Sequence, residues 1–317
     1  MTVDIDIAIK AKLEAAQNIL IASHVRPDGD AIGSLLGLGL ALQAAGKTVQ
    51  MVLSDGIPAS FRHLPGSDQV KKEPKDGFDL FVTVDCADFR RVGKQFETVR
   101  HPDINIDHHV TNERFGQLNL VEPQAVATAA VLTDHLSKWG LEISRDVAAN
   151  LATGIVTDTL GFRTSNTTPA SLRQMAMLME TGIDMPDLYN RSLVRRSYAA
   201  AKYWGAGLSS LTTLDGIVYG TLRIADRKNA GYGGNDDADL INVISAIEDH
   251  AVGMVFVEQG DSVKISWRAL QPGIDVSKVA QFFGGGGHQA AAGADIPGKL
   301  EEIQLRVLAA TREKLKL

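Results

Sequence analysis

The first half of the chain alternates short apolar runs with segments of helical periodicity. Short, nearly continuous apolar runs are typical of strands buried on both faces of a parallel sheet. Thr168 followed by Pro169 predicts the N-cap and first turn of a helix. Strands that alternate with helices indicate an α/β fold with a mainly parallel sheet and helices on both faces. We expect strands at residues 19–23, 48–53, 79–84 and 104–106 and helices at about residues 31–45, 125–139 and 144–158.

The pattern changes after about residue 190, where a stretch rich in arginine precedes a second set of apolar runs. Residues 217–224, 251–258 and 263–268 read as strands, and residues 284–287 are four consecutive glycines. We therefore expect three parts: a larger domain over residues 1–190, a helical connector over residues 191–208, and a smaller α/β domain over residues 209–317.

The composition restricts the classes of function. No apolar run reaches the roughly 18 residues that a membrane-spanning helix needs. Cys86 is the only cysteine, which excludes an intrachain disulfide and favours a reducing cytoplasm. The net charge is -6, whereas proteins that grip long duplex DNA by its phosphates usually carry a basic surplus. We expect a cytoplasmic protein that binds neither membranes nor long duplex DNA.

Aspartate and histidine recur at the ends of the apolar segments expected in the first half. Polar groups at the carboxyl ends of parallel strands meet at one edge of the sheet, where ligands of open α/β folds bind. A single aspartate there is usually a turn residue, but adjacent histidines behind an aspartate need partners if they are buried. The recurring residues are His24, Asp28, Asp30, Asp85, Asp107, His108, His109 and Asp158.

This set of side chains suits a divalent metal. Carboxylates and imidazoles without a thiolate favour Mn²⁺ or a similar ion. The ligands are more numerous than one ion needs, and two ions about 3.5–4 Å apart would use them with one bridging carboxylate. Four further histidines lie neither in this cluster nor next to the glycine run. We interpret them as surface or hydrogen-bonded core residues: His63, His101, His135 and His250.

These motifs resemble those of the DHH family of phosphoesterases. The first is His24-x-x-x-Asp28-x-Asp30, and Asp85, Asp107-His108-His109 and Asp158 follow in the family's order. The glycine run that ends in His288 resembles the signature of the associated DHHA1 domain. The resemblance covers nearly the whole chain and implies a catalytic domain, a substrate domain and an active site in the cleft between them.

The resemblance also implies a role for each residue. One metal ion would be held by His24, Asp28 and Asp85. The other would be held by Asp30, Asp85, His108 and Asp158, with Asp85 as the bridge. His109 would face the scissile phosphate, and Asp107 would orient a histidine. We expect two Mn²⁺ ions as cofactors and a water molecule, rather than an enzyme side chain, as the nucleophile.

The second half offers candidate substrate ligands. Arg268 ends an expected strand, and its guanidinium can pair with a phosphate through two hydrogen bonds. Gly285, Gly286 and Gly287 would let backbone N–H groups approach an anion, and His288 follows them directly. A glycine run alone more often serves a tight turn, so this assignment depends on the neighbouring arginine, histidine and DHHA1 resemblance. Arg163 is a further candidate for phosphate contact.

Within the DHH family, the chain most resembles the oligoribonucleases that also act on pAp, and this resemblance implies a phosphodiesterase that degrades short single-stranded oligoribonucleotides to mononucleotides and removes the 3′-phosphate of pAp. The main alternative is a phosphodiesterase for cyclic di-AMP or its linear product pApA. A long-chain exonuclease resembling RecJ, an inorganic pyrophosphatase and a catalytically idle nucleotide-binding regulator fit less well. The sequence leaves open which substrate is preferred and whether the chain forms a homodimer.

Overall fold

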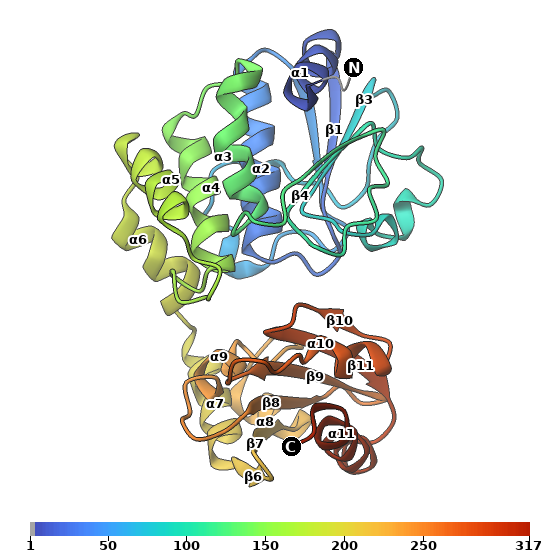
Figure 1. The fold of residues 1–317 in the computed structure, drawn as a ribbon, viewed down its shortest axis with the longest axis vertical. Helices are drawn as coiled ribbons and strands as arrows, with labels where there is room; N and C mark the ends of the chain where they lie inside the picture. The colour runs from blue at the N-terminus through green and yellow to red at the C-terminus, as the bar shows by residue number, and fades with distance from the viewer. Residues whose placement is uncertain (1–3) are drawn as a thin grey trace. The chain divides into compact units, whose positions relative to one another are not determined.

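The computed structural model describes residues 4–317, and these residues form two compact units that divide between Arg195 and Arg196. The first unit contains a five-stranded parallel sheet of order β2-β1-β3-β4-β5 (Figure 1). The expected parallel sheet is therefore confirmed, and β5 is an additional strand at its edge. The strands are β1 (Asn18–Ala22), β2 (Thr48–Val52), β3 (Leu80–Val84), β4 (Ile104–Asp107) and β5 (Leu118–Val121).

Five of the α-helices in the first unit begin with a side-chain cap, namely α1, α2, α4, α5 and α6. Thr168 caps α5 as expected, because its side chain accepts a hydrogen bond from the backbone N–H of Ser171. The segment expected as one helix over residues 125–139 is an α-helix followed by a 3₁₀-helix. The α-helices are α1 (Ile5–Ala15), α2 (Gly29–Ala44), α3 (Thr128–His135), α4 (Arg145–Asp158), α5 (Pro169–Glu180) and α6 (Met185–Tyr189). The remaining helical segments are η1 (Ala59–Phe61), η2 (Ser67–Gln69), η3 (Phe89–Val92), η4 (Lys94–Phe96), η5 (Leu136–Trp139) and the π-helix η6 (Asn190–Val194).

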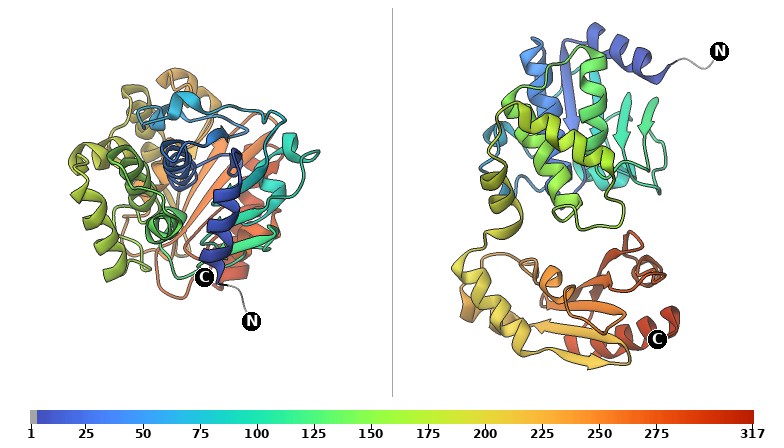
Figure 2. Two further views of the ribbon diagram at one scale, coloured as in Figure 1. Left: turned by 90° about the horizontal axis from the view of Figure 1, so that it is seen from above. Right: turned by 60° about the vertical axis from the view of Figure 1, so that its left-hand side comes forward.

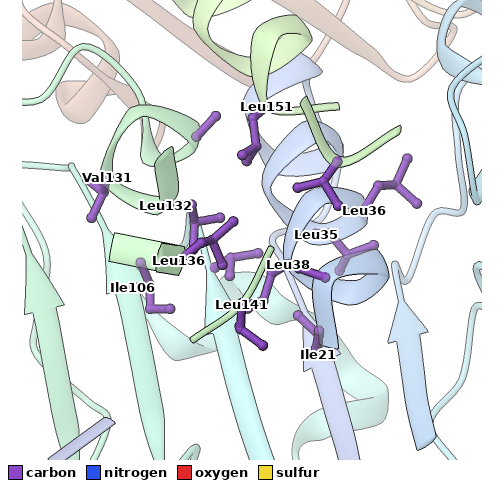
Figure 3. Close-up of a cluster of buried hydrophobic side chains, with 14 of the residues drawn as sticks. Ile21, Leu35, Leu36, Leu38, Ile106, Val131, Leu132, Leu136, Leu141 and Leu151 are labelled. Carbon is purple, nitrogen blue, oxygen red and sulfur yellow. The ribbon is translucent and has the colours of Figure 1, made fainter. Parts of the chain in front are cut away.

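The two faces of this sheet are covered differently. The main core lies between the sheet and the α-helices, where Ile21 of β1 and Ile106 of β4 meet Leu35 of α2 and Leu132 of α3 (Figure 3). The opposite face carries Phe81 of β3 and is covered by loops that contain η3 and η4. Helices therefore lie on both faces, with the long α-helices on one and short 3₁₀-helices on the other.

Glycines allow α2 and α4 to pack closely. A Cβ atom on Gly33 would lie 2.4 Å from the carbonyl oxygen of Asn150, and one on Gly29 would lie 2.3 Å from Oγ1 of Thr157. On the α4 side, a Cβ on Gly154 would lie 2.7 Å from Oδ1 of Asp30. Both helices would have to move apart to accept larger residues. This close approach brings the first turn of α2 near the last turns of α4.

The second unit is an α/β layer built on a six-stranded mixed sheet of order β10-β11-β9-β8-β7-β6 (Figure 2). Within it, β7 and β8 are parallel and the other neighbours are antiparallel. One face packs against α10 and α11, and the other against α7 and α9. The strands are β6 (Thr212–Leu214), β7 (Ile217–Leu222), β8 (Val252–Glu258), β9 (Ser262–Ala269), β10 (Gly286–Gly287) and β11 (Ala291–Pro297). The helices are α7 (Tyr198–Ser209), α8 (Ile224–Ala230), α9 (Leu240–Ile244), α10 (Ser277–Phe282) and α11 (Leu300–Leu315).

The α/β class of both units agrees with the expectation from the sequence. Within residues 4–317, no helix is both long enough and apolar enough to cross a membrane.

Candidate metal centre

The aspartates and histidines singled out in the first half come together at the carboxyl edge of the parallel sheet. In each of three groups, the ligand atoms lie within 4.8 Å of one another. Asp85 belongs to two of these groups, and His108 also belongs to two. A shared carboxylate and a shared imidazole connect the groups into one centre. The groups are His24 with Asp28 and Asp85; Asp30 with His108 and Asp158; and Asp85 with His108 and His109.

His24 presents its Nε2 atom to two carboxylates. This atom lies 3.9 Å from Oδ2 of Asp28 and 3.5 Å from Oδ2 of Asp85. The other ring nitrogen, Nδ1, lies 2.9 Å from the carbonyl oxygen of Val25, and a carbonyl can only accept a hydrogen bond. The proton therefore belongs on Nδ1, and Nε2 carries the lone pair that a metal ion requires.

His108 has the same arrangement on the other side of Asp85. Its Nε2 atom lies 3.9 Å from Oδ2 of Asp30, 3.8 Å from Oδ1 of Asp85 and 3.6 Å from Oδ2 of Asp158. Its Nδ1 atom lies 3.2 Å from the carbonyl oxygen of Ala125. Both histidines are thus oriented by backbone carbonyls, as is usual for metal-binding imidazoles.

Asp30 connects the centre to helix α3. Its Oδ2 atom accepts a 2.6 Å hydrogen bond from the backbone N–H of Thr128, and its Oδ1 atom accepts one of 2.9 Å from the N–H of Ala129. These amides belong to the first turn of α3, whose own N-cap, Ala127, has no side chain to cap them. The carboxylate of Asp30 therefore caps α3 from α2, and the positive end of the helix favours its negative charge.

The centre concentrates negative charge. Burial and the charges of Asp85 and Asp158 raise the pKa of Asp30 well above its ordinary value. Burial, with the charges of Asp28 and Asp85, also raises the pKa of Asp158 to about 7, against the opposing effect of His108. These carboxylates repel one another, so a divalent cation among them would remove a large electrostatic cost. The residues present therefore fit a metal ion.

Asp85 occupies the middle of the centre. Burial alone would raise the pKa of its carboxyl, but His24, His109 and His108 outweigh burial and hold it well below its ordinary value. Its Oδ1 atom also accepts a 2.9 Å hydrogen bond from Oγ1 of Thr128. The backbone of Asp85 has a φ of 52°, in the left-handed region that aspartate tolerates better than most residues.

His109 is held by Asp107 rather than by a carbonyl. Its Nδ1 atom donates a 2.7 Å hydrogen bond to Oδ1 of Asp107, and it lies 3.6 Å from Oδ1 of Asp85. Burial would lower the pKa of His109, but the hydrogen bond to Asp107 and the charges of both aspartates raise it to about 9. Asn112 donates to Oδ2 of Asp107 at 2.5 Å and to Oδ1 of Asn105 at 2.8 Å. Our reading of the sequence missed both asparagines, although Asn112 follows His109 by only three residues.

The candidate substrate residues outside this cluster lie in both units. Arg163 is an exposed residue of the first unit, five positions after Asp158 at the end of α4. Arg268 belongs to β9 of the second unit, where its guanidinium donates to the carbonyl oxygen of Trp267 at 3.1 Å and to Oδ1 of Asn242 at 3.5 Å. Burial lowers the pKa of Arg268 against the charges of Asp237 and Asp239. A role for Arg163 or Arg268 in substrate binding stays a prediction.

The glycine run forms part of a hairpin in the second unit. Gly286 and Gly287 pair with β11, and the N–H of His288 donates to the carbonyl oxygen of Ala291 at 2.7 Å. A Cβ on Gly285 would lie 2.2 Å from the carbonyl oxygen of Gly293, so the hairpin itself requires glycine there. The backbone N–H of Gly285 donates to the carbonyl oxygen of Ala280. Backbone packing thus accounts for part of the run, and its contact with substrate stays a prediction.

An open parallel sheet with linked aspartate–histidine groups at its carboxyl edge defines an α/β protein with a candidate multi-metal centre. Residues 18–155 match the model of the DHH family, N-terminal domain, and residues 222–313 match that of the DHHA1 domain. A Thermus thermophilus protein named bifunctional oligoribonuclease and PAP phosphatase NrnA is 38% identical over 303 residues, which cover 94% of this chain and 90% of that protein. The chain belongs to the DHH family and combines a DHH domain with a DHHA1 domain.

Two solved structures extend this comparison. An exopolyphosphatase-related protein from Bacteroides fragilis has a TM-score of 0.89 and is 25% identical, and the match covers 98% of this chain and 96% of that one. The exonuclease RecJ bound to manganese has a TM-score of 0.51 at 15% identity, with 100% of this chain and 95% of that one covered. The second similarity shows a shared fold alone, and the manganese belongs to that structure.

Proposed function

We propose that this chain is a two-metal phosphoesterase that hydrolyses short single-stranded oligoribonucleotides to mononucleotides and also removes the 3′-phosphate of pAp. The observation that carries the proposal is the linked centre, in which Asp85 and His108 are each shared between groups of metal-binding side chains. The Thermus thermophilus relative, named for both activities, supports this choice of substrates.

Two divalent ions, Mn²⁺ by preference, are the cofactors of this proposal. One would be held by His24, Asp28 and Asp85. The other would be held by Asp30, His108, Asp158 and Asp85, with Asp85 as the bridge. Oxygen and imidazole ligands without sulfur suit Mn²⁺. When bound, such ions lower the pKa of water and offset negative charge on the phosphoryl oxygens.

His109 is the group that we assign to the scissile phosphate. Asp107 accepts a hydrogen bond from Nδ1–H of its ring, so Nε2 is the atom that would exchange a hydrogen bond or a proton with the substrate. With a pKa raised to about 9, the ring is cationic at neutral pH before metal and substrate bind. A cationic imidazole can pair with a phosphoryl oxygen and then protonate the leaving oxygen. Asp107 would stabilise this charge, with Asn112 fixing the carboxylate in turn.

The second unit would supply substrate selection. We assign residues 1–190 to catalysis, residues 191–208 to a connector and residues 209–317 to binding of the substrate. Arg268 is half-buried in β9 and His288 is exposed on the glycine hairpin; both are cationic or can become so. A terminal phosphate is the substrate group that such residues recognise. Arg163, an exposed residue of the first unit, is a further candidate for phosphate contact.

The deciding experiment compares substrates in parallel. The metal-stripped protein would be loaded with Mn²⁺ and incubated with 5′-labelled RNA dimers to pentamers, with pAp and with cyclic di-AMP. We expect the short RNAs and pAp to be hydrolysed faster than cyclic di-AMP. Faster opening of cyclic di-AMP, or faster cleavage of pApA than of other dinucleotides, would replace this proposal with the second-messenger alternative. No Mn²⁺-dependent cleavage of any substrate would reject the two-metal assignment itself.

A further inference from the structure

A second cluster of charged side chains lies in the first unit, outside the metal centre, around His135 at the end of α3. Its Nδ1 atom lies 2.5 Å from Oδ1 of Asp6 in α1, and its Nε2 atom lies 3.0 Å from Oε1 of Glu122. Trp139 donates to the same Asp6 oxygen at 2.9 Å, and Lys138 lies 3.3 Å from its Oδ2 atom. His135 is almost fully buried.

Both ring nitrogens of His135 face carboxylate oxygens. Ionised carboxylates only accept hydrogen bonds, so both nitrogens must donate, which makes the ring an imidazolium. Burial would lower the pKa of His135, but the hydrogen bonds to Glu122 and Asp6 outweigh burial and raise it, against the charge of Lys138. His135 is therefore a charged imidazolium that forms hydrogen-bonded ion pairs with Glu122 and Asp6, and not a neutral core histidine.

Glu122 and His135 close a loop whose residues support the metal centre. The carbonyl of Ala125 accepts from Nδ1 of His108. The backbone N–H groups of Thr128 and Ala129 donate to Asp30, and the hydroxyl of Thr128 donates to Asp85. Three assigned metal ligands thus take an orienting contact from residues 125–129, which lie between the two ends of the ion pair.

The Glu122 end of this loop is fixed to the sheet. The backbone N–H of Glu122 donates to the carbonyl oxygen of Asp107 at 3.0 Å, directly before His108. The N–H of Ala125 donates back to the carbonyl of Glu122 at 2.9 Å, which forms a tight turn. A displacement of the Glu122 side chain would therefore be passed to the Ala125 carbonyl, and a displacement of His135 would be passed along the short helix α3 to Thr128.

We infer that the Glu122–His135 ion pair is a positioning device that holds residues 122–135 in the conformation that orients His108, Asp30 and Asp85 for metal binding. Asp6 anchors the same histidine to α1, so the N-terminal helix takes part in this arrangement. The inference deepens the proposed function and rests on it, because it assumes that these three residues bind metal. Neither Glu122 nor His135 is assigned a direct contact with metal or substrate.

The test measures Mn²⁺ binding by the full chain. Metal-stripped protein would be titrated with Mn²⁺, and the free ion would be counted from its electron paramagnetic resonance signal. His135→Gln should weaken binding by up to about tenfold, the lower end of the range for direct partners of metal ligands, because His135 acts on the ligands through residues 125–129. Glu122→Gln, which keeps a hydrogen-bond acceptor, should weaken it several-fold, and the double variant should be no worse than His135→Gln alone.

Two control variants separate positioning from simple stabilisation. His101→Gln makes the same substitution at an exposed histidine and should leave Mn²⁺ binding unchanged. Ile19→Val removes a methyl group from the buried core of β1, and should lower the thermal unfolding midpoint without changing Mn²⁺ affinity. If His135→Gln lowers the midpoint and binds Mn²⁺ as tightly as the wild type, the positioning inference is wrong.

The remaining outcomes are also distinct. If His135→Gln fails to fold, the Mn²⁺ affinity of Glu122→Gln decides the question. This variant should fold, because glutamine has nearly the same shape as glutamate. Unchanged Mn²⁺ affinity in that variant would then reject the inference. A wild-type chain that binds no Mn²⁺ would reject the proposed function itself, together with the inference that depends on it.

Discussion

The Nδ1 atom of His109 donates a 2.7 Å hydrogen bond to Oδ1 of Asp107, two residues earlier in the chain. Asp107 is fully buried, and its other carboxylate oxygen accepts from Asn112. The pair therefore behaves as an orienting carboxylate and an oriented imidazole, in which Asp107 keeps a proton on Nδ1 and fixes the direction in which Nε2 points.

Replacing Asp107 by asparagine should lower the pKa of His109. In the metal-free wild type, burial acts to lower this pKa, but Asp107 and Asp85 raise it to about 9. Asparagine keeps a hydrogen-bond acceptor and removes the charge, so the pKa should move back toward 6.5. Proton NMR titration of the ring checks this. An unchanged pKa would show that Asp107 is not the source of the shift.

Replacing Asp85 by asparagine should remove most Mn²⁺ binding and the hydrolysis that depends on it. Asparagine tolerates the left-handed backbone at this position, so the fold should survive. Loss of a shared ligand should weaken Mn²⁺ binding by at least about 100-fold, since loss of a group that only hydrogen-bonds to a ligand can already weaken metal binding by that much. Calorimetric titration would measure the affinity. Asp88→Asn, at a nearby aspartate that pairs with Arg90, is the matched control and should bind normally.

Asp158→Asn should stabilise the metal-free protein at high pH. The folded pKa of Asp158 is raised from 3.8 to about 7, so its ionisation opposes folding. This cost begins above pH 3.8 and is complete above about pH 7. The variant should therefore melt higher than the wild type at pH 8 and show a much smaller difference at pH 4. Saturating Mn²⁺ should reverse the order at pH 8. A lower melting temperature in the metal-free variant at pH 8 would contradict this.

Gly33→Ala should destabilise the first unit. The new Cβ would lie 2.4 Å from the carbonyl oxygen of Asn150, so α2 and α4 must separate. Overpacking of this kind costs about 1–3 kcal/mol. Gly205→Ala in α7, where a Cβ meets nothing within 4 Å, is the control and should raise stability by up to about 1 kcal/mol. Differential scanning calorimetry would measure both. Equal changes in stability for the two substitutions would mean that the close approach of Gly33 to Asn150 does not require glycine.

The sequence predicts the parts of this fold that depend on local pattern. The strands β1 to β4 are recognisable because each is a short apolar run followed by polar residues. The metal centre is predictable because those polar residues follow strands that share a carboxyl edge. By contrast, β5 is a four-residue, half-buried edge strand with a weak pattern, and our reading did not find it. We also did not predict the N-terminal helix α1.

The contacts that orient the site were beyond prediction for a different reason. Thr128 bonds to Asp85, 43 residues away, and the carbonyl of Ala125 bonds to His108, 17 residues away, so tertiary packing brings these groups together. Asn112 lies only five residues after Asp107, but an asparagine at this spacing has no pattern that marks it as a partner. The sequence predicts a surface or hydrogen-bonded core histidine at His135, and the structure shows this side chain buried and hydrogen-bonded. Its two carboxylate partners lie 129 and 13 residues away, so its charge depends on the folded chain.

The double role of Asp30 limits how this site can diverge. The carboxylate that we assign to a metal ion also accepts hydrogen bonds from the first turn of α3. A descendant that abandoned hydrolysis would still need a hydrogen-bond acceptor at this position, because Ala127, the N-cap residue of α3, has no side-chain acceptor of its own. Aspartate or asparagine at this position would therefore persist for reasons of folding, and its presence alone would be poor evidence of an active enzyme. Asp28 has a similar double role, because its side chain caps α2 by accepting from the backbone N–H groups of Asp30 and Ala31. Asp158, the last residue of α4, is therefore the better record of catalysis in such a lineage.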